Sequence, residues 1–411
     1  MNPLDRKRVI VIGGGASGLL AAGVAAGRGA QVTLLERNHL MGRKLHISGK
    51  GRCNVTNATD IPGLERNIPG NPKFLRSAFY RFGPQEAIAF FSEHEVPCKT
   101  ERGGRVFPES DNADDVVHAL VQFCRQQGVH LVPDVAVQHV MTADGQVIGV
   151  KAEHGQEYHA DAVILATGGA SYPGTGSRGD GYRMAEELGH TIIPIRPSLV
   201  PLETEEAWPA EAQGLSLRNV ELTAFAPDGK KLYSDRGEML FTHFGITGPL
   251  VLTASRHVAD KPGSHITLDL KPALDEATLD ARVLRDFEKF NRREFSNALA
   301  ELLPRSLIPV IIKLSGIAPH TFIHQITREE RLRFVHLLKH LSLTVKRPRS
   351  MFEAIITVGG VNTKEIDSRT MESKLVHGLF LTGEVIDVDG YTGGFNLQIA
   401  WSTGHLAGES V

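Results

Sequence analysis

The chain begins with short apolar runs that alternate with glycine and small residues. Val9 to Ile12 are consecutive apolar residues, and a second apolar run covers Val32 to Leu35. Short apolar runs of this kind, rich in β-branched residues and bounded by glycine, are typical of buried strands. The segment between them, Leu19 to Ala26, consists of small and apolar residues that suit a packed helix. The pattern therefore predicts a β-α-β unit at the start of the chain.

Further along, the spacing of apolar positions predicts helices and strands that belong to the same domain. Helical periodicity is found around residues 73–95 and 113–127. Strand-like patterns are found at residues 130–132, 135–140, 147–152 and 162–165, and the last segment, residues 378–411, again has the composition of a nucleotide-binding fold.

The middle of the chain has a different pattern. From about residue 192 to 270, strands with short turns recur, for example at 217–225, 239–242 and 266–270, which predicts a β-rich barrel or sandwich. Residues 275–341 indicate several short helices, and strands resume near residue 343 and at 354–358.

The 411 residues are enough for two or three domains, at about 150 residues per domain. We expect an α/β fold, namely a Rossmann-like nucleotide-binding domain with a β-rich barrel insert that itself carries a helical insert. The expected boundaries are 1–191 and 355–411 for the nucleotide-binding domain, 192–273 and 342–354 for the β-rich domain, and 274–341 for the helical domain.

The first turn carries the spacing Gly13-x-Gly15-x-x-Gly18, and the second strand ends at Glu36. In a dinucleotide-binding unit the first glycine permits the tight turn and the second lets the backbone approach a pyrophosphate. The third lets the helix pack close to the strand, and the acid binds the ribose diol. An acid at position 36 also disfavours a 2′-phosphate. The unpaired amides of Ala16 and Ser17 at the helix start favour an anionic diphosphate.

Three later segments favour FAD over a nicotinamide as the bound cofactor. The strand at 162–165 ends in the small turn Thr167-Gly168-Gly169. A strand near the C-terminus ends in Gly383-Glu384, where the acid can accept a hydrogen bond from the ribityl chain. Gly394, Phe395, Asn396 and Leu397 open a helix, and a helix N-terminus stabilises the negative charge that develops on a reduced isoalloxazine.

Five motifs resemble those of a bacterial flavoprotein family. They are the loop Gly42-Arg43-Lys44 with Ser48 to Asn57, and the segments at 103–108, 241–249, 357–361 and 383–387. The family comprises the 3-dehydro-bile-acid-reductase-like, or aminoacetone-oxidase-like, NAD(P)/FAD-dependent oxidoreductases, and its fold is similar to that of glutathione-reductase-type flavoproteins. Lys50 departs from the family loop, where a third glycine is common, and we expect it near the diphosphate.

The resemblance implies a set of FAD contacts that extends the fingerprint, including backbone contacts from Val135 to adenine. The expected cofactor-binding residues are Gly13, Gly15, Ala16, Ser17, Gly18, Glu36, Arg37, Arg43, Lys44, Ser48, Gly49, Gly51, Arg52, Cys53, Asn54, Val135, Thr167, Gly168, Gly169, Gly383, Glu384, Gly394, Phe395, Asn396 and Leu397.

Candidate catalytic residues have two interpretations each. His243, in the β-rich segment, is a proton donor or anion binder, or else a structural histidine. Tyr391 presents its hydroxyl at the flavin edge or simply packs. Arg105, with Arg102, lines the substrate side or lies on the surface. A second Gly174-x-Gly176-x-x-Gly179 does not directly follow a strand, so we expect NAD(P)H to visit the flavin transiently rather than to have its own domain.

Cysteine usage and hydropathy indicate the cellular compartment of the protein. The three cysteines, Cys53, Cys98 and Cys124, are widely spaced, which argues against a disulfide scaffold, a zinc site or a dithiol centre, and no metal is expected. Cys53, in the loop from Ser48 to Asn57, is either a packing residue or a redox group. No apolar window approaches the ~20 residues of a membrane span. We expect a protein of the reducing cytoplasm without a membrane partner, and the oligomeric state stays open.

Charge is distributed unevenly along the chain. The net charge is −2, but residues 281–349 contain 14 Lys and Arg against 6 Asp and Glu. These charges form either solvated helix faces or a surface for an anionic partner such as ribosomal RNA.

The sequence thus predicts an FAD-dependent oxidoreductase that moves hydride between NAD(P)H, the flavin N5 atom and an activated C=C or C=O of a small-molecule substrate. The alternatives are a flavin-dependent reductase of uridine in ribosomal RNA, a small-amine oxidase, and a non-catalytic flavin- or nucleic-acid-binding protein.

Overall fold

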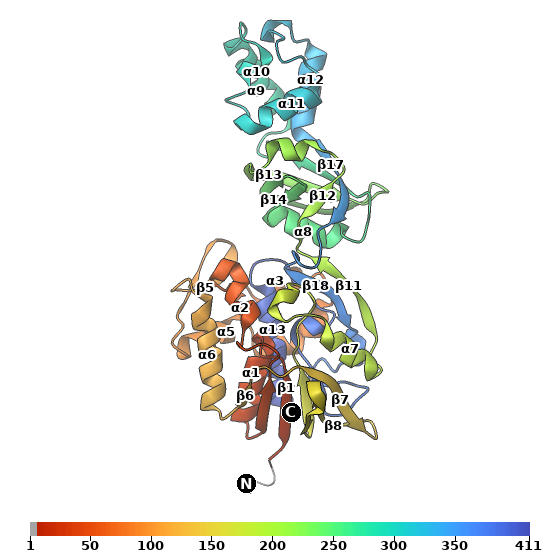
Figure 1. The fold of residues 1–411 in the computed structure, drawn as a ribbon. Coiled ribbons are helices and arrows are strands. Elements are labelled where there is room, and N and C mark those ends of the chain that lie inside the picture. Colours follow the sequence, from red (N-terminus) through yellow and green to blue (C-terminus); the bar gives the residue numbers. More distant parts are fainter. Residues whose placement is uncertain (1–5) are drawn as a thin grey trace. The chain divides into compact units, whose positions relative to one another are not determined.

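The computed structural model describes residues 6–411. Its contacts divide the chain into two compact units (Figure 1). The first unit contains the residues up to Arg196 together with Ile355–Val411, and the second unit contains Pro197–Ala354. Each unit has its own hydrophobic core.

The first unit is built on a five-stranded parallel sheet, which confirms the Rossmann-like fold. The strand order is β19-β10-β1-β2-β6. Nearly all residues of the three central strands are buried, because helices and loops cover both faces of a parallel sheet. The strands are β1 (Arg8–Ile12), β2 (Gln31–Leu35), β6 (His130–Val132), β10 (Ala162–Leu165) and β19 (Leu379–Leu381).

Two helices with glycine at their contact lie together in this unit, namely α1 (Ala16–Gly27) and α13 (Phe395–Ser410). A Cβ atom at Gly404 would collide with the backbone of Ser17, and one at Gly408 would lie 2.6 Å from the Ala21 carbonyl oxygen. The missing side chains therefore allow a close approach that holds the N-terminal turn of α1 against the C-terminal helix.

The other elements of the first unit form the loops and small sheets around this core. Antiparallel sheets are formed by β3 (Thr56–Asn57), β5 (Arg105–Pro108) and β4 (Cys98–Thr100), and by β7 (Val137–Ala143), β8 (Gln146–Ala152) and β9 (Glu157–His159). A two-stranded sheet pairs β11 (Ile192–Ser198) with β18 (Ile356–Val361). The helices are α2 (Arg43–Ile47), α3 (Ile61–Arg66), α4 (Arg76–Arg81), α5 (Pro84–Glu93), α6 (Ala113–Gln126) and α7 (Asp180–Glu187).

The second unit contains a closed six-stranded barrel, as the β-rich pattern predicted. Its strand order is β12-β15-β14-β13-β16-β17, and the closure leaves no free sheet edge in the barrel. The strands are β12 (Leu202–Thr204), β13 (Ser216–Phe225), β14 (Lys231–Thr242), β15 (Gly245–Thr247), β16 (His265–Asp269) and β17 (Leu341–Pro348).

Four helices are inserted between β16 and β17, at one end of the barrel, and α8 (Pro249–Val258) lies at the other end (Figure 1). They are α9 (Glu276–Lys289), α10 (Phe295–Ala298), α11 (Ile308–Ser315) and α12 (Arg328–Lys339). The sequence placed these helices in a third domain at 274–341. In the structure, buried residues such as Phe287 and Phe334 join those of the barrel in one hydrophobic core, so barrel and helices form one compact unit.

Membrane insertion through a helix finds no support here. Among residues 6–411, none of the helices combines the length and the apolar character needed to span a bilayer.

Candidate functional site

Of the three fingerprint glycines, Gly13 and Gly15 lie between β1 and α1, and Gly18 lies in the first turn of α1. They have different structural roles. Gly13 has φ +105°, and a Cβ there would lie 2.6 Å from the Ala166 carbonyl oxygen. A Cβ at Gly18 would collide with the Gly13 carbonyl oxygen. At Gly15, by contrast, φ is −87° and no protein atom lies within 4 Å of an added Cβ. The protein itself requires Gly13 and Gly18, whereas only a bound group would require Gly15.

Gly15 is also the N-cap of α1, and it gives this helix no side-chain cap. The first amides of an uncapped helix favour an anion through hydrogen bonds and the helix dipole. Open space beside Gly15 and an uncapped helix start therefore fit the diphosphate of a dinucleotide. The predicted residues Ala16 and Ser17 form the first turn.

Glu36 directly follows β2 and is 8% exposed. Its carboxylate accepts hydrogen bonds from the backbone amide of Gly14 at 2.7 Å and from the backbone amide of Asn38 at 2.8 Å. These contacts fix the acid beside the fingerprint loop, and its remaining lone pairs suit a ribose diol.

Val135 and Arg37 are two other predicted FAD contacts, and the Val135 amide and the Arg37 guanidinium already have partners within the protein. The Val135 amide donates to the Glu36 carbonyl at 2.9 Å, so a backbone contact to adenine would have to use the Val135 carbonyl. The Arg37 guanidinium forms an ion pair with Asp180 at the start of α7, which follows the second glycine motif.

The signature loop after Gly42 has an unusual backbone. Gly49, Lys50, Gly51 and Cys53 all have positive φ. Lys50, at φ 61°, thus occupies a left-handed conformation that glycine adopts without strain, which explains why glycine suits this position. The lysine side chain is exposed.

Cys53 is fully buried, and burial raises the pKa of its thiol to about 12. The protonated thiol is a poor nucleophile, which favours the packing interpretation of this residue. Its amide donates to the Ser48 carbonyl and so closes the loop. Its neighbour Asn54 accepts a hydrogen bond from the Gly394 amide at 2.9 Å.

Lys44 and Glu384 meet from opposite ends of the chain. The Lys44 ammonium donates to the Glu384 carboxylate at 2.9 Å and to the Ser171 hydroxyl at 2.7 Å. The same carboxylate accepts from the Ser171 hydroxyl at 3.0 Å and from the Thr357 amide at 2.7 Å. Burial opposes ionisation of Glu384, but Lys44 and these hydrogen bonds outweigh it and hold the pKa of the carboxyl below its ordinary value.

This cluster contains two residues that the sequence did not single out. Ser171 follows the Thr167–Gly169 turn, and Thr357 opens one of the family motifs, but neither spacing indicates a partner. The turn itself fits closely around the cluster, because a Cβ at Gly169 would lie 2.5 Å from the Thr357 hydroxyl oxygen. The buried hydroxyl of Thr167 has no hydrogen-bond partner within the described residues, and it packs against Gly181, where an added Cβ would lie 2.0 Å from it.

The start of α13 is held open by its surroundings. Gly394, at φ +99°, leaves no room for a side chain next to Thr56. Asn396 turns its side chain back to the loop, with its amide nitrogen 2.7 Å from the Gly390 carbonyl oxygen and 3.2 Å from that of Tyr391. The side chain of Asn396 therefore holds the Tyr391 loop, and the backbone amides of Phe395 to Leu397 form an uncapped helix start.

Arg105, predicted on the substrate side, and Arg52, predicted to contact FAD, belong to one charged cluster. Arg52 pairs with Glu101 and Asp111 and lies 4.0 Å above the Phe107 ring. Arg105 is exposed, and its guanidinium lies 3.6 Å from Glu101. These contacts give Arg105 the character of a surface charge, and those of Arg52 tie the signature loop to β5. Arg43 donates to the Asn38 side chain at 3.1 Å.

The catalytic candidates lie in different units. Tyr391 is part of the first unit, and its amide donates to the Asn67 carbonyl at 2.9 Å. His243 is exposed on the hairpin between β14 and β15 of the second unit, with its ring against Phe244.

The residues present fit FAD. The fit rests on the open space beside Gly15 and on the uncapped starts of α1 and α13. Comparison with known proteins agrees with this, because residues 7–410 match the family described as HI0933-like protein Rossmann domain.

The chain belongs to this family. Among curated members of similar length, the chain is 35% identical to 3-dehydro-bile acid delta(4,6)-reductase of Clostridium scindens, over 98% of this chain and 99% of that protein. It is 33% identical to ribosomal RNA dihydrouridine synthase of Haemophilus influenzae, over 98% of each chain. This HI0933-like protein is an enzyme, an FAD-dependent oxidoreductase.

A solved structure supports the fold of this HI0933-like protein. The 3-ketosteroid-delta4-(5alpha)-dehydrogenase of Rhodococcus jostii RHA1 aligns with 99% of this chain and 97% of its own, with a TM-score of 0.51 and 16% identity.

Proposed function

We propose that this enzyme reduces a carbon–carbon double bond conjugated to a carbonyl, with NAD(P)H as the electron donor. The observation that carries the proposal is the open space beside Gly15 at the uncapped start of α1, in the same unit as the uncapped start of α13 at Gly394. FAD, when bound, accepts a hydride from a nicotinamide and passes it to an acceptor carbon.

The chain's own residues bind and orient the cofactor. The start of α1 takes the diphosphate and Glu36 takes the ribose. The Lys44–Glu384 pair is partly buried. The Glu384 carboxylate accepts hydrogen bonds from Lys44, the Ser171 hydroxyl and the Thr357 amide, and these three donors keep it in one orientation. The carboxylate can accept a hydrogen bond from a hydroxyl of the ribityl chain without moving.

The start of α13 supplies electrostatic stabilisation. The amides of Phe395, Asn396 and Leu397 have no carbonyl four residues earlier within the helix to bind. Positive partial charge at these amides stabilises negative charge that develops on the flavin edge. Asn54 holds this helix start through the Gly394 amide, so the amides are preorganised.

The acceptor needs a proton as well as a hydride. Reduction of a conjugated double bond places a hydride on one carbon and a proton on its neighbour, and a positioned side chain provides the proton. Tyr391 is our candidate in the FAD-binding unit, because Asn396 and Asn67 fix its loop. His243 is the candidate from the barrel unit.

The names of the relatives support this class of reaction. One relative is a delta(4,6)-reductase of a 3-dehydro bile acid, and another makes dihydrouridine. Both activities saturate a double bond conjugated to a carbonyl. We place the small-molecule substrate first, because the basic surplus at 281–349 is offset elsewhere in the second unit. Residues 197–354 contain 21 Lys and Arg against 20 Asp and Glu.

A uridine in ribosomal RNA is the second candidate substrate, and a specific observation favours it. Of the 14 basic residues at 281–349, seven have carboxylate partners, and Arg293 stacks on Phe290. Within residues 6–411 the other six have no ion-pair partner and remain available to phosphates. They are Arg285, Arg292, Arg305, Arg328, Arg333 and Lys346.

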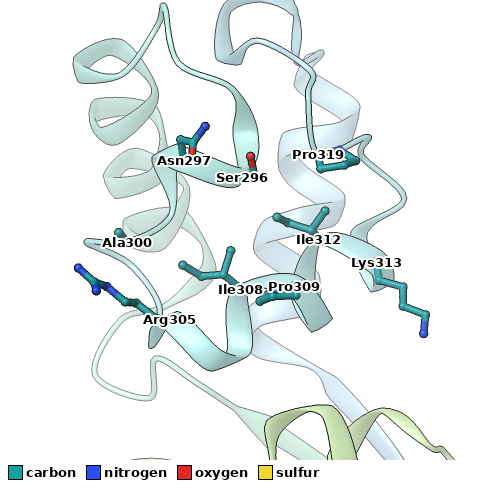
Figure 2. A pocket seen from close by; sticks show the side chains of 9 residues that line it. All are labelled: Ser296, Asn297, Ala300, Arg305, Ile308, Pro309, Ile312, Lys313 and Pro319. Atoms are coloured by element: carbon teal, nitrogen blue, oxygen red, sulfur yellow. The ribbon is translucent and has the colours of Figure 1, made fainter.

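A pocket of about 650 Å³ lies beside α10 and α11 in the same unit. Figure 2 shows its apolar wall of Ile308, Pro309 and Ile312, with Arg305 and Lys313 extending from opposite sides. The wall suits a base and the two cations suit phosphates. Lys313 also contacts Glu211, but its side chain is 68% exposed. The remaining lining residues are Ser296, Asn297, Ala300 and Pro319.

The three cysteines support a reducing compartment. Cys53, Cys98 and Cys124 are all free thiols, so we place the enzyme in the cytoplasm.

One experiment tests the proposal and separates its two substrates. The FAD-loaded enzyme is reduced anaerobically by NADH or NADPH, and re-oxidation is followed at the flavin absorbance. We expect re-oxidation by a 3-keto steroid with a conjugated double bond, but not by its saturated counterpart. Rapid re-oxidation by uridine-containing RNA alone establishes the second candidate. If neither acceptor re-oxidises the flavin and only the admission of oxygen does, both candidate substrates are overturned in favour of an oxidase.

A further inference from the structure

Two histidines and a glutamate converge at the base of the helical insertion of the second unit. Glu276 is the first residue of α9, His336 lies in the last turn of α12, and His340 follows that helix. One ligand atom from each of the three side chains lies within 4.8 Å of the other two. All three side chains are exposed and thus accessible to an ion.

The spacing of the atoms is that of a metal site. The Nδ1 atoms of His336 and His340 lie 3.2 and 3.5 Å from the same carboxylate oxygen of Glu276. Ligand atoms about 2.0–2.1 Å from a tetrahedral zinc ion lie about 3.4 Å apart. The two imidazole rings are stacked, with centroids 4.2 Å apart, because residues four apart share one helix face.

The chemistry of the ligands selects the kind of metal. Two imidazoles and one carboxylate suit borderline ions such as Zn²⁺, Co²⁺ or Ni²⁺, whereas Mg²⁺ and Ca²⁺ prefer all-oxygen sites. The C-terminus of α12 favours a cation, and the N-terminus of α9 favours the carboxylate of Glu276. The Nδ1 atom of His340 also lies 3.2 Å from the His336 carbonyl oxygen, and a metal ion bound to Nδ1 would replace this contact.

We propose that Glu276, His336 and His340 bind one divalent transition-metal ion that clamps the two ends of the helical insertion. The insertion leaves the barrel after β16, with α9 as its first helix, and α12 and His340 directly precede β17. A metal bridge between α9 and the end of α12 closes this segment at its base and thereby restricts the unfolded chain. This inference does not depend on the proposed function.

The test uses the full-length FAD-loaded protein, freed of metal by a chelator and titrated with Zn²⁺ and Co²⁺. We expect one ion per chain by calorimetry and the visible absorption bands of tetrahedrally coordinated Co²⁺. At a hundredfold excess of Zn²⁺ over Kd, the Tm of the unit that contains the site should rise by about 5–10 °C.

Variants assign the ligands. His336→Ala and His340→Ala should each weaken Zn²⁺ binding at least tenfold and abolish the Co²⁺ bands, with FAD content unchanged. His320→Ala is the matched control, because His320 is an exposed histidine whose Nδ1 lies 3.2 Å from Glu294, outside this cluster. Stoichiometric binding that survives both cluster variants overturns the proposal, as does absence of Zn²⁺ binding to the wild-type protein.

Discussion

Gly15 and Gly18 lie three residues apart at the start of α1, and the structure assigns them different tasks. Gly15→Val should abolish FAD binding yet leave the fold intact, because φ is −87° and no protein atom lies within 4 Å of an added Cβ. Gly18→Ala should destabilise the protein, because its Cβ collides with the Gly13 carbonyl oxygen. Flavin absorbance per chain and thermal unfolding separate the two effects. A Gly15→Val protein with full flavin content would contradict the assignment of the diphosphate to this turn.

The pair Lys44–Glu384 predicts a pH dependence of stability. The folded state holds the pKa of Glu384 below its ordinary value of 4.5, so the carboxylate stabilises the fold above that pH. This stabilisation is lost as the pH falls through the lower pKa of the folded state. Glu384→Gln should therefore lower the free energy of unfolding by about 1–3 kcal/mol at pH 7, the scale of charged hydrogen bonds, and by less as the pH falls below 4.5.

Urea unfolding of both proteins at several pH values measures this difference. Glu372→Gln provides a control, because Glu372 is a carboxylate of the same unit that contacts His377 and not Lys44. A difference between wild type and Glu384→Gln that stays constant down to pH 3 would show that the charge of Glu384 is not what stabilises the fold.

Local spacing revealed the residues of the site better than their partners. The glycines and Glu36 follow from the strand-turn-helix pattern, since their tasks arise within one β-α-β unit. Glu384 could be located, but its contact with Lys44 joins residues 340 positions apart. Ser171 and Thr357 complete the same cluster without any periodic signal of their own. Side-chain partners at such separations depend on tertiary packing, which hydrophobic periodicity does not encode.

At the scale of elements, the start of α13 carries a prediction for the flavin midpoint potential. Asn396→Pro should lower it, because the substitution removes an amide that would stabilise negative charge on the reduced flavin. The side chain of Asn396 also holds the Gly390–Tyr391 loop, so Asn396→Ala is the matched control for that contact. Dye-coupled titration measures both potentials. Equal potentials in the two variants, with FAD bound, would assign the effect to the loop rather than to the helix.

The elements themselves were predicted unevenly. Strands β6 and β10 have the expected bounds, and α6 ends one residue before the expected limit, because these segments are short, strongly patterned and bounded by breakers. Only the last four residues of β14 (Lys231–Thr242) were recognised. Its first part is mostly polar, since one of its faces is exposed, and so it lacks the apolar signal. His336 and His340 are four apart in the sequence, but Glu276 comes from another helix, 60 residues away.

At the scale of the whole molecule, charge is balanced more locally than the sequence indicated. The surplus at 281–349 includes Arg347 and Arg349, but both arginines bind the carboxylate of Glu203, at 2.7 and 2.8 Å. Reversal of their charge would disturb the barrel, where β12 pairs with β17, and would not test RNA binding. The cations without acidic partners are the ones that can report on RNA.

If these cations bind RNA, affinity should fall linearly with the logarithm of salt concentration, with a slope of about −0.7 per phosphate contact for a single strand. Neutralising Arg285, Arg292 and Arg305 together with glutamine should make the slope shallower by about 2, because three contacts are lost. Arg369→Gln, an exposed arginine of the first unit, should leave the slope unchanged. Fluorescence anisotropy with a uridine-containing oligonucleotide at several salt concentrations gives the slopes. If the triple variant keeps the wild-type slope, Arg285, Arg292 and Arg305 belong to a solvated surface and do not bind RNA.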